Sequence, residues 1–266
     1  MSVNPIEAFS LAGRRAVLVG AGSGIGREAA RTFAAAGAYV TIADCNAAGL
    51  DETADLIRSE AGSVDSLVLD VRNRDEVEAL ARRAAAGGRI DVWGNLAGVI
   101  SLGQVTEMDP VELDRIIDVN LKGTYWGCAA AARIMVPQGK GSIINISSAG
   151  ADAAHEGLSV YSLTKAAVNM LTRTLATEVA GHGVRVNAIA PGFIDTPMID
   201  YRYRKSDGSL DQEVKQSLFE QRRLNTPLKV VGQPRDIALA MVYLASDASS
   251  FMTGQVIRPN GGIVMP

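Results

Sequence analysis

The sequence predicts an α/β fold with a doubly wound parallel sheet of about seven strands and helices on both faces. Three observations support this class. Short apolar runs alternate with helix-like segments along most of the chain. The first run, 16–20, is continuously apolar, as expected for a strand that is covered on both faces. A glycine-rich stretch then joins this run to the first helical segment.

In the first half of the chain, each expected helix follows an apolar run. Glycine marks where two of these helices end, at Gly37 and at the pair 87–88, because glycine is favoured just past a helix end. The elements expected here are a strand at 16–20, a helix at 27–37, a strand at 39–44, a helix at 47–60, a strand at 66–70, a helix at 74–88 and a strand at 90–98.

In the second half, Asp109 and Pro110 are suited to the N-cap and first position of a long helix. This helix is expected to reach about Val136, where Pro137 stops it. Residues 193–231 break the alternation and read as polar and irregular. The remaining elements are a strand at 141–148, a helix at 159–179, a strand at 183–192, a helix at 234–245 and a strand at 254–262.

The composition suits one domain over 1–266, because no linker, repeat or low-complexity tract divides the 266 residues. The net charge of −3 gives no reason to expect nucleic acid or an anionic membrane as a partner. The N-terminus lacks a secretory signal, and no uncharged apolar stretch has the length of a membrane span. Two cysteines and two histidines show no ligand spacing, so we expect no metal and a reducing, cytoplasmic location.

The glycine-rich stretch "VGAGSGIGRE" has the physical properties of a phosphate-binding turn. Gly20, Gly24 and Gly26 form G-x-x-x-G-x-G, with Gly22 as an extra glycine, which departs from the usual G-x-G-x-x-G dinucleotide pattern. Glycines allow a tight turn and let a pyrophosphate approach the backbone at a helix N-terminus. An ordinary turn between strand and helix remains the alternative.

An acid at the end of the second strand indicates which dinucleotide the turn serves. Asp44 lies 24 residues after Gly20, close to the expected spacing. A carboxylate there accepts hydrogen bonds from both ribose hydroxyls of NAD and repels the 2′-phosphate of NADP. The alternative is a surface aspartate that caps the following helix.

The stretch "VYSLTKAAVNML", residues 160–171, places Tyr161 and Lys165 four residues apart. Such residues lie on one helix face, one turn apart. Alone, this spacing indicates no more than a buried aromatic beside a lysine that extends to solvent.

From about residue 11 to 262, the chain resembles the short-chain dehydrogenase/reductase family in its short single-domain form, which has a Rossmann-like fold. The ordered set of motifs, rather than any one of them, carries the resemblance. The motifs are the glycine turn at 20–26, Asp44, "DV" at 70–71, "NLAG" at 95–98, "VNLKGT" at 119–124, "INISS" at 144–148, "YSLTK" at 161–165, "VNAIAPGFIDTPM" at 186–198 and "LASD…TGQVI…NGG" near the end.

The resemblance implies four catalytic residues. Tyr161 is the general acid/base, and Lys165 lowers its pKa and binds the nicotinamide ribose; an adjacent cation can lower a tyrosine pKa by about 1–3 units. Ser148, 13 residues before Tyr161, hydrogen-bonds the substrate oxygen, with Ser147 as the neighbour not chosen. Asn120 holds a water that links Lys165 to solvent.

The resemblance also implies a cofactor site for NAD. Asp70 binds the adenine amino group, and the "NLAG" loop lines the adenosine ribose. Ser23 and Cys45 stand where NADP-preferring relatives often have a basic residue, and Arg27 is expected on the helix surface. The implied cofactor-binding residues are Gly20, Ser23, Gly24, Ile25, Gly26, Asp44, Asp70, Val71, Asn95, Ala97, Gly98, Tyr161, Lys165, Pro191, Gly192, Ile194 and Thr196.

The expected function is an NAD-dependent oxidoreductase that transfers a hydride between nicotinamide and a small secondary alcohol or ketone. One alternative is a 3-oxoacyl thioester (acyl-carrier) reductase that uses NADPH, whose anionic carrier the basic stretch "YRYRK" at 201–205 could meet. A solvated face of the lid is the other reading of that stretch. An alternative of another class is a non-catalytic NAD-binding sensor, which would be expected to lose a catalytic residue.

Residues 193–231 are expected to form a substrate lid with an apolar wall, because the family uses this segment for specificity and long irregular loops are often functional. His155 is expected in solvent rather than at the substrate. Members of the family are usually homotetramers, and "YWGCAAAARIM" at 125–135 is apolar enough for a subunit interface or for packing on its own sheet. The residues expected to form the wall of the lid are Met198, Tyr201, Tyr203, Leu218 and Phe219.

Overall fold

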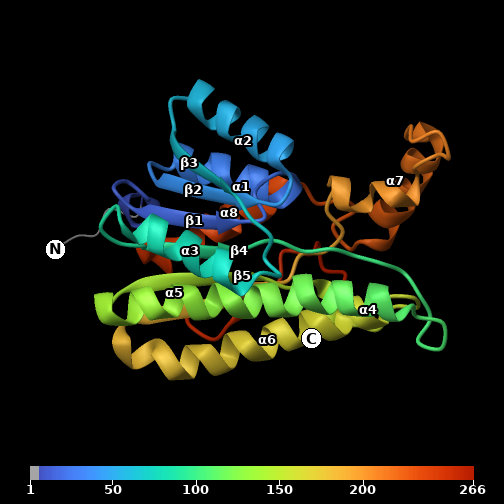
Figure 1. Ribbon diagram of the computed structural model, residues 1–266. Coiled ribbons are helices and arrows are strands. Elements are labelled where there is room, and N and C mark those ends of the chain that lie inside the picture. The colour runs from blue at the N-terminus through green and yellow to red at the C-terminus, as the bar shows by residue number, and fades with distance from the viewer. Residues whose placement is uncertain (1–5) are drawn as a thin grey trace.

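The computed structural model describes residues 6–266, and its strands form one parallel sheet in the order β3-β2-β1-β4-β5-β6-β7 (Figure 1). All six strand pairings are parallel, which confirms the predicted fold class. The strands are β1 Arg15–Val19, β2 Tyr39–Asp44, β3 Ser63–Val68, β4 Val92–Asn95, β5 Gly141–Ile146, β6 Val184–Ile189 and β7 Val256–Ile257.

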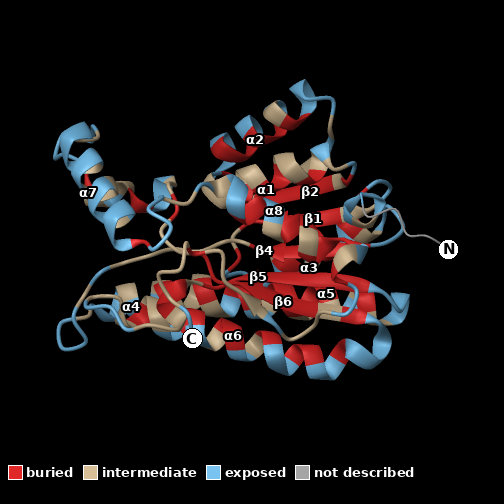
Figure 2. Cartoon of the chain, turned by 180° about the vertical axis from the view of Figure 1, so that it is seen from behind, coloured by how far each residue is buried: buried red, intermediate tan, exposed pale blue. Residues whose placement is uncertain are grey.

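Helices cover both faces of the sheet, because the apolar central strands must be shielded from water on both sides. One core cluster joins the sheet to α1 (Gly24–Ala35), α2 (Ala47–Ser59) and α8 (Pro234–Ala245). The other cluster joins it to α3 (Arg74–Ala85), α5 (Thr124–Gln138) and α6 (Ser159–Val179). Figure 2 shows the buried residues gathered in the sheet and on the helix sides that face it.

The strand order reverses direction beside β1, which pairs with β2 on one side and with β4 on the other. The chain leaves β1 toward one edge of the sheet and later leaves β4 toward the opposite edge. In sheets of this kind, ligands bind outside the carboxyl ends of the strands at such a switch point. The glycine turn after β1 and the loop after β4 both lie there.

The long helix expected over 109–136 consists of three consecutive segments. Asp109 caps α4 (Pro110–Ile116) by accepting a hydrogen bond from the N–H of Val111. A π-helical segment, η2 (Ile117–Gly123), follows before α5 begins. Pro137 does not stop α5, which continues to Gln138 and ends where Gly139 adopts a left-handed conformation with φ 68°. π-helical turns often occur at functional sites.

The third strand and the lid also differ from expectation. β3 covers 63–68 rather than 66–70, and it is an edge strand, so it tolerates polar residues such as Asp65, which pairs with Arg83. Residues 193–231 are not irregular throughout, since they contain η5 (Pro197–Arg202) and α7 (Gln212–Asn225). Asp211 caps α7, which has no buried residue and projects from the end of the sheet (Figures 1 and 2).

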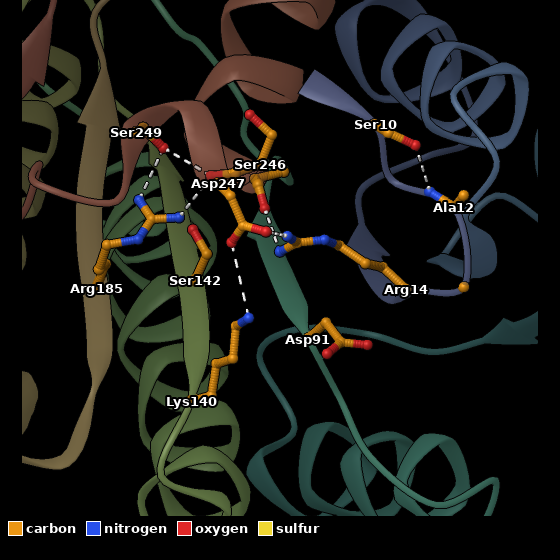
Figure 3. Close-up of polar contacts among 12 residues, drawn as sticks. Ser10, Ala12, Arg14, Asp91, Lys140, Ser142, Arg185, Ser246, Asp247 and Ser249 are labelled. Atoms are coloured by element: carbon orange, nitrogen blue, oxygen red, sulfur yellow. Dashed lines mark hydrogen bonds and ion pairs between the residues drawn. The ribbon is translucent and has the colours of Figure 1, made fainter. Parts of the chain in front are cut away.

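A polar cluster fastens the end of α8 to the amino ends of the strands, opposite the switch point (Figure 3). Arg185, at the start of β6, donates hydrogen bonds to the carbonyls of Leu244 and Ser246 at 2.8 and 3.2 Å and to the hydroxyl of Ser249 at 2.9 Å. Arg14 forms an ion pair of 2.6 Å with Asp247. The cluster therefore anchors the C-terminal helix far from the carboxyl ends of the strands. No helix within residues 6–266 is long and apolar enough to cross a membrane.

Candidate active site

A cavity of about 750 Å³ lies at the carboxyl ends of the strands, between the glycine turn, the loop after β4, the start of α6 and the lid. It brings together residues that are far apart in the sequence. Of the sequence-predicted site residues, all except Asn95 and Asn120 line it: Gly20, Ser23, Gly24, Ile25, Gly26, Asp44, Asp70, Val71, Ala97, Gly98, Ser148, Tyr161, Lys165, Pro191, Gly192, Ile194 and Thr196.

The glycine turn forms one end of the cavity and cannot carry side chains at its two closest contacts. A Cβ on Gly20 would lie 2.3 Å from the backbone nitrogen of Ala97, and one on Gly26 would lie 1.8 Å from the carbonyl oxygen of Gly20. Gly20 also has a φ of 91°, which side chains disfavour. The turn thus leads β1 into the N-terminus of α1 with its backbone open to the cavity, as a bound pyrophosphate requires.

Asp44 ends β2 with its carboxylate held by backbone donors. It accepts hydrogen bonds from the N–H of Gly22 at 2.8 Å and from the N–H of Asn46 at 2.9 Å. The helix cap that was the alternative role for Asp44 belongs to Asn46, whose side chain accepts from Gly49 at the start of α2. Asp44 therefore presents a fixed anionic group to the cavity.

Arg27 braces the glycine turn from behind rather than lying free on the helix surface. Its guanidinium donates to the carbonyl of Gly22 at 2.7 Å, to the hydroxyl of Thr53 at 3.0 Å and to Glu52 at 2.7 Å. These contacts tie the turn to α2, so Arg27 supports the shape of the turn. It is not among the residues that line the cavity.

The part of the cavity beside Asp70 carries an ion pair that the sequence motifs did not reveal. The carboxylate of Asp70 accepts hydrogen bonds from Nε of Arg72 at 2.8 Å and from the backbone N–H of Arg72 at 2.9 Å. The hydrogen bond with the Arg72 side chain is the largest cause that lowers the pKa of Asp70. Arg72 lines the cavity beside Asp70, so an adenine bound there would meet the pair rather than a lone acid.

Tyr161 and Lys165 project from the first two turns of α6 toward Ser148. The ammonium nitrogen of Lys165 lies 5.7 Å from the centre of the Tyr161 ring and donates to the carbonyl of Ile146 at 2.9 Å. Lys165 is only 3% exposed, and this burial lowers its pKa to about 8.

The pKa of Tyr161 is shifted in the direction opposite to the one expected. Burial raises it, and the hydrogen bond with the Ser148 hydroxyl offsets part of that rise. The sequence-based expectation gave this lowering role to Lys165, whose ammonium instead bonds the carbonyl of Ile146. Burial disfavours the charged phenolate, and here it outweighs the hydrogen bond.

The two neighbouring serines after β5 have different partners. The hydroxyl of Ser147 donates to the backbone carbonyl of Lys165 at 3.0 Å, and Ser147 is buried. The hydroxyl of Ser148 accepts from the N–H of Gly150 at 3.1 Å and reaches the phenol of Tyr161. Ser148 is thus the serine whose hydroxyl stands beside the tyrosine.

Asn120 lies in the π-helical segment, fully buried behind the cavity wall. Its amide accepts from the N–H of Val99 at 2.8 Å and donates to the carbonyl of Val99 at 2.9 Å. A Cβ on Gly98 would lie 3.4 Å from both the Asn120 side-chain oxygen and the Lys165 nitrogen, so the two side chains flank the same loop. Asn120 therefore fixes the loop beside Lys165, and its part in a water chain stays a prediction.

The side chain of Asn95 points into the core, so any contact of Asn95 with a cofactor would have to come from its backbone. Its amide oxygen accepts from the indole N–H of Trp93 at 2.8 Å, and its amide nitrogen donates to Asn145 at 2.8 Å. Asn95 is 5% exposed and is not part of the cavity wall, where Leu96 stands instead. The side chain of Asn95 therefore joins β4 to β5, and a contact of this residue with the ribose stays a prediction.

The segment 193–231, which was expected to form a lid, lines the cavity mostly with residues other than those expected. Of the five expected residues, only Met198 lines the cavity. Tyr203 is buried, donates to Asp200 at 2.7 Å and packs edge-on against Phe219, which stabilises the lid itself. Four residues line the cavity although they were not expected there. His155 lies before α6, and the other three, Phe193, Arg202 and Arg222, belong to the segment 193–231.

No group of three or more metal-ligating side chains occurs in the part of the chain that the structure describes. Both Cys45 and Cys128 are free thiols. Ser148, Tyr161 and Lys165 line the cavity together, and their hydroxyl, phenol and ammonium groups offer acid–base and hydrogen-bonding chemistry.

Comparisons with known proteins place this chain among enzymes. The family model described as enoyl-(acyl carrier protein) reductase matches residues 20–264. Galactitol 2-dehydrogenase (L-tagatose-forming) of Cereibacter sphaeroides is 37% identical over 96% of each chain. The 3-oxoacyl-[acyl-carrier-protein] reductase of Thermotoga maritima is 36% identical over 96% of this chain and 99% of that one.

Two solved structures show nicotinamide dinucleotides on the same fold. A gluconate 5-dehydrogenase from Burkholderia cenocepacia in complex with NADP and tartrate has a TM-score of 0.88 and 32% identity, covering 97% of this chain and 98% of that one. A 7α-hydroxysteroid dehydrogenase with NADH and 7-oxo glycochenodeoxycholic acid has a TM-score of 0.89 and 31% identity, covering 100% and 99%. With this fold, this cavity and these relatives, the chain belongs to the short-chain dehydrogenase/reductase family of oxidoreductases.

Proposed function

We propose that the protein is an NAD-dependent oxidoreductase that transfers a hydride between nicotinamide and a small secondary alcohol or ketone. The observation that carries the proposal is the cluster of Ser148, Tyr161 and Lys165 in one cavity with the glycine turn and Asp44. The first three residues offer proton transfer at a substrate oxygen. The turn and Asp44 offer a dinucleotide site.

The residues of the cavity fit a dinucleotide. The glycine turn leaves no room for side chains and opens its backbone, which suits the pyrophosphate. Asp44 would accept the adenosine ribose hydroxyls, and its charge disfavours a 2′-phosphate. Lys165 would hold the nicotinamide ribose, and Thr196 with its neighbours the carboxamide. When bound, the nicotinamide accepts or donates the hydride.

The chain's own residues handle the proton and the developing charge. In the oxidation direction, the phenol of Tyr161 first passes its own proton onward toward Lys165 and solvent, and the phenolate then takes the proton from the substrate hydroxyl. In reduction, the phenol gives a proton to the substrate oxygen. Ser148 donates a hydrogen bond to the same substrate oxygen and stabilises negative charge there. Lys165 is buried near the phenol of Tyr161, and the pKa of its ammonium is about 8. The Lys165 ammonium can therefore pass a proton onward near neutral pH.

A 3-oxoacyl thioester reductase that uses NADPH is the second candidate. The family description and the Thermotoga maritima relative favour it. The fixed carboxylate of Asp44 opposes it, because the 2′-phosphate of NADPH would meet a like charge. The cofactor preference of the purified protein separates the two candidates.

The test compares the wild type with Tyr161→Phe on a panel of secondary alcohols, including galactitol, aldonates, steroids and 3-hydroxyacyl thioesters. We expect NADH formation with at least one alcohol and a loss of at least 1,000-fold in kcat in the variant, with NADH affinity unchanged. Tyr243→Phe, which changes a tyrosine on α8, is the matched control. Turnover that survives in Tyr161→Phe, or NADH binding without any turnover, would replace the proposed enzyme with another mechanism or with a sensor.

The assembly and the lid belong to the same proposal. Apolar side chains stay exposed on α5 and α6, including Tyr125, Leu163 and Met170 at 51%, 58% and 58%. Pairing of these helices between subunits would cover them, which supports a homotetramer. Light scattering should give a mass of four chains, and Met170→Glu should lower it.

We propose a reducing, cytoplasmic location in view of the two free thiols. We also propose that residues 193–231 form a substrate lid.

A further inference from the structure

Four arginines line the candidate active-site cavity, and two of them differ from the rest. Arg72 is bound to Asp70, and Arg115 is bound to Glu112 with two contacts of 2.8 Å. Arg202, at the end of η5, and Arg222, in α7, form no ion pair with any carboxylate in the described part of the chain, although Glu156 lines the same cavity. The two unpaired guanidiniums come from separate elements of the lid.

The arginines next to these two in the lid do have carboxylate partners. Arg204 pairs with Asp200, and Arg223 forms two hydrogen bonds with Glu220 at 2.6 and 2.7 Å. Arg222 instead turns inward and lies over the ring of Phe193 at 5.3 Å, and its Nε is buried without a hydrogen-bond partner. A buried donor left without a partner costs free energy unless a ligand satisfies it.

The positive charges of the two guanidiniums also repel each other. Burial lowers the pKa of Arg222, and the charge of Arg202 lowers it further. Arg202 gives one hydrogen bond, from Nε to the hydroxyl of Tyr201 at 3.1 Å, which leaves its terminal nitrogens free of described partners. Two cations that line one cavity without an anion repel each other, and an anionic oxygen group bound by both would relieve the repulsion and complete the hydrogen bonds.

The pair lines the same cavity as the residues expected to act on the substrate. Arg202, Arg222, Ser148 and Tyr161 all line the one cavity. A small molecule that reaches Tyr161 with its hydroxyl can therefore present a second group to the arginines.

We propose that the substrate is a secondary alcohol or ketone that also carries an anionic oxygen group, a carboxylate or a phosphate, which Arg202 and Arg222 bind together. The proposal rests on the oxidoreductase function above and adds the chemical class of its substrate. Guanidinium groups suit both anions, because each can form paired charge-assisted hydrogen bonds with two oxygens.

The first experiment compares matched anionic and neutral substrates. The pairs are D-gluconate with D-glucitol, D-galactonate with galactitol, and D-glucitol 6-phosphate with D-glucitol, each with NAD⁺ and NADP⁺. We expect kcat/KM to be at least 30-fold higher for the anionic member of one pair, and the pair concerned identifies carboxylate or phosphate. Equal or higher values for every neutral member would overturn the substrate class while leaving the oxidoreductase function in place.

The second experiment replaces each arginine. Arg202→Gln and Arg222→Gln should lower kcat/KM for the anionic substrate by about 10–100-fold, the usual value of a charge-assisted contact, and for its neutral partner by less than about 3-fold. Arg204→Gln and Arg223→Gln, which remove neighbouring arginines that already have carboxylate partners, are the controls and should change neither value. Equal losses on both substrates would contradict the proposal.

A binding measurement separates the proposed role from two other outcomes. NADH affinity, followed by fluorescence, should be the same in Arg222→Gln and in the wild type; weaker NADH binding would assign the arginines to the cofactor pyrophosphate instead. With NADH present, D-gluconate or D-glucitol 6-phosphate should raise the melting temperature of the wild type and of Tyr161→Phe, but not of Arg222→Gln. This shift tests the arginines even if no alcohol is turned over, and its absence in the wild type would overturn the proposal.

Discussion

The carboxylate of Asp44 accepts a hydrogen bond of 2.8 Å from the backbone N–H of Gly22, so the acid at the end of β2 is joined to the glycine turn after β1. A Cβ on Gly22 would lie 2.8 Å from the carboxylate carbon, so no other residue fits there unless the aspartate moves. The two features that indicated a dinucleotide site in the sequence are thus one structural unit. The hydrogen bond with the glycine turn therefore fixes the position of the Asp44 carboxylate.

Removing this charge should change the choice between the two cofactors. Asp44→Asn keeps an oxygen that can accept from Gly22 but loses the negative charge. We expect the ratio of kcat/KM for NAD⁺ to that for NADP⁺ to fall by about 10–100-fold, because one charge-assisted contact is lost and the repulsion of the 2′-phosphate disappears. Initial rates with each cofactor measure the ratio. Asp55→Asn, an exposed change on α2, should leave it unaltered, and a wild type that prefers NADP⁺ would refute the argument.

The raised pKa of Tyr161 should be visible without a substrate. The ordinary pKa of tyrosine is 10.0, and burial moves the pKa of Tyr161 above this value. The protonated phenol therefore persists through neutral and mildly alkaline pH. Subtracting the ultraviolet titration of Tyr161→Phe from that of the wild type, both without cofactor, should show phenolate absorbance only above pH 10. A midpoint below pH 10 would mean that Lys165 outweighs burial after all.

Much of the fold could be predicted because it depends on local pattern. The bounds of α6 and α8 match the prediction, since apolar spacing, Pro234 and the glycine after α6 define them within a few residues. The π-helical segment could not be predicted, because no residue type is specific to it and the amide of Asn120 is satisfied by Val99, 21 residues away. α7 was missed because it buries none of its residues and so lacks a clear apolar stripe.

The site shows the same division between local pattern and tertiary contact. Residues whose role depends on the backbone, such as Gly20 and Gly26, lie at the cavity as their spacing indicated. Asn95 is adjacent to Leu96 in the chain, yet strand alternation turns it into the core and only the packing of Trp93 and Asn145 reveals this. The role of Arg222 depends on the inward turn of one α7 residue, which its sequence neighbours do not indicate.

Lys165 should make the protein less stable at neutral pH, because a buried ammonium is costly. Its pKa is about 8 in the folded chain and about 10.4 when unfolded, so between these values the unfolded chain binds more protons and stability rises with pH. Below pH 8 the penalty is fully present. Lys165→Met should therefore stabilise the fold by about 1–3 kcal/mol at pH 7 and by less at pH 10.

Thermal unfolding of Lys165→Met at the two pH values measures this difference, and turnover should be lost even though the fold is more stable. Lys122→Met is the control, because the side chain of Lys122 is 57% exposed and its ammonium pairs with Asp118. Surface pairs of this kind contribute little, so its effect should stay within about 1 kcal/mol at either pH. A variant at Lys165 that is less stable at pH 7 would show that the contact with Ile146 outweighs the cost of burying the charge.

Arg185 should matter for stability and not for catalysis, because its contacts lie at the amino ends of the strands (Figure 3). Its guanidinium donates to the carbonyls of Leu244 and Ser246 at the end of α8. No other arginine or lysine among residues 6–266 donates to these two carbonyls. Arg185→Met removes these hydrogen bonds and should lower the free energy of unfolding by about 2–3 kcal/mol in urea titrations. The kcat of the folded variant should stay within 2-fold, roughly the scatter expected for a remote change. Arg58→Met is the control, because it removes only an exposed ion pair with Asp55 and should lower the free energy of unfolding by less than about 0.5 kcal/mol. Equal losses of unfolding free energy in the two variants would show that the cluster at the end of α8 does not anchor this helix.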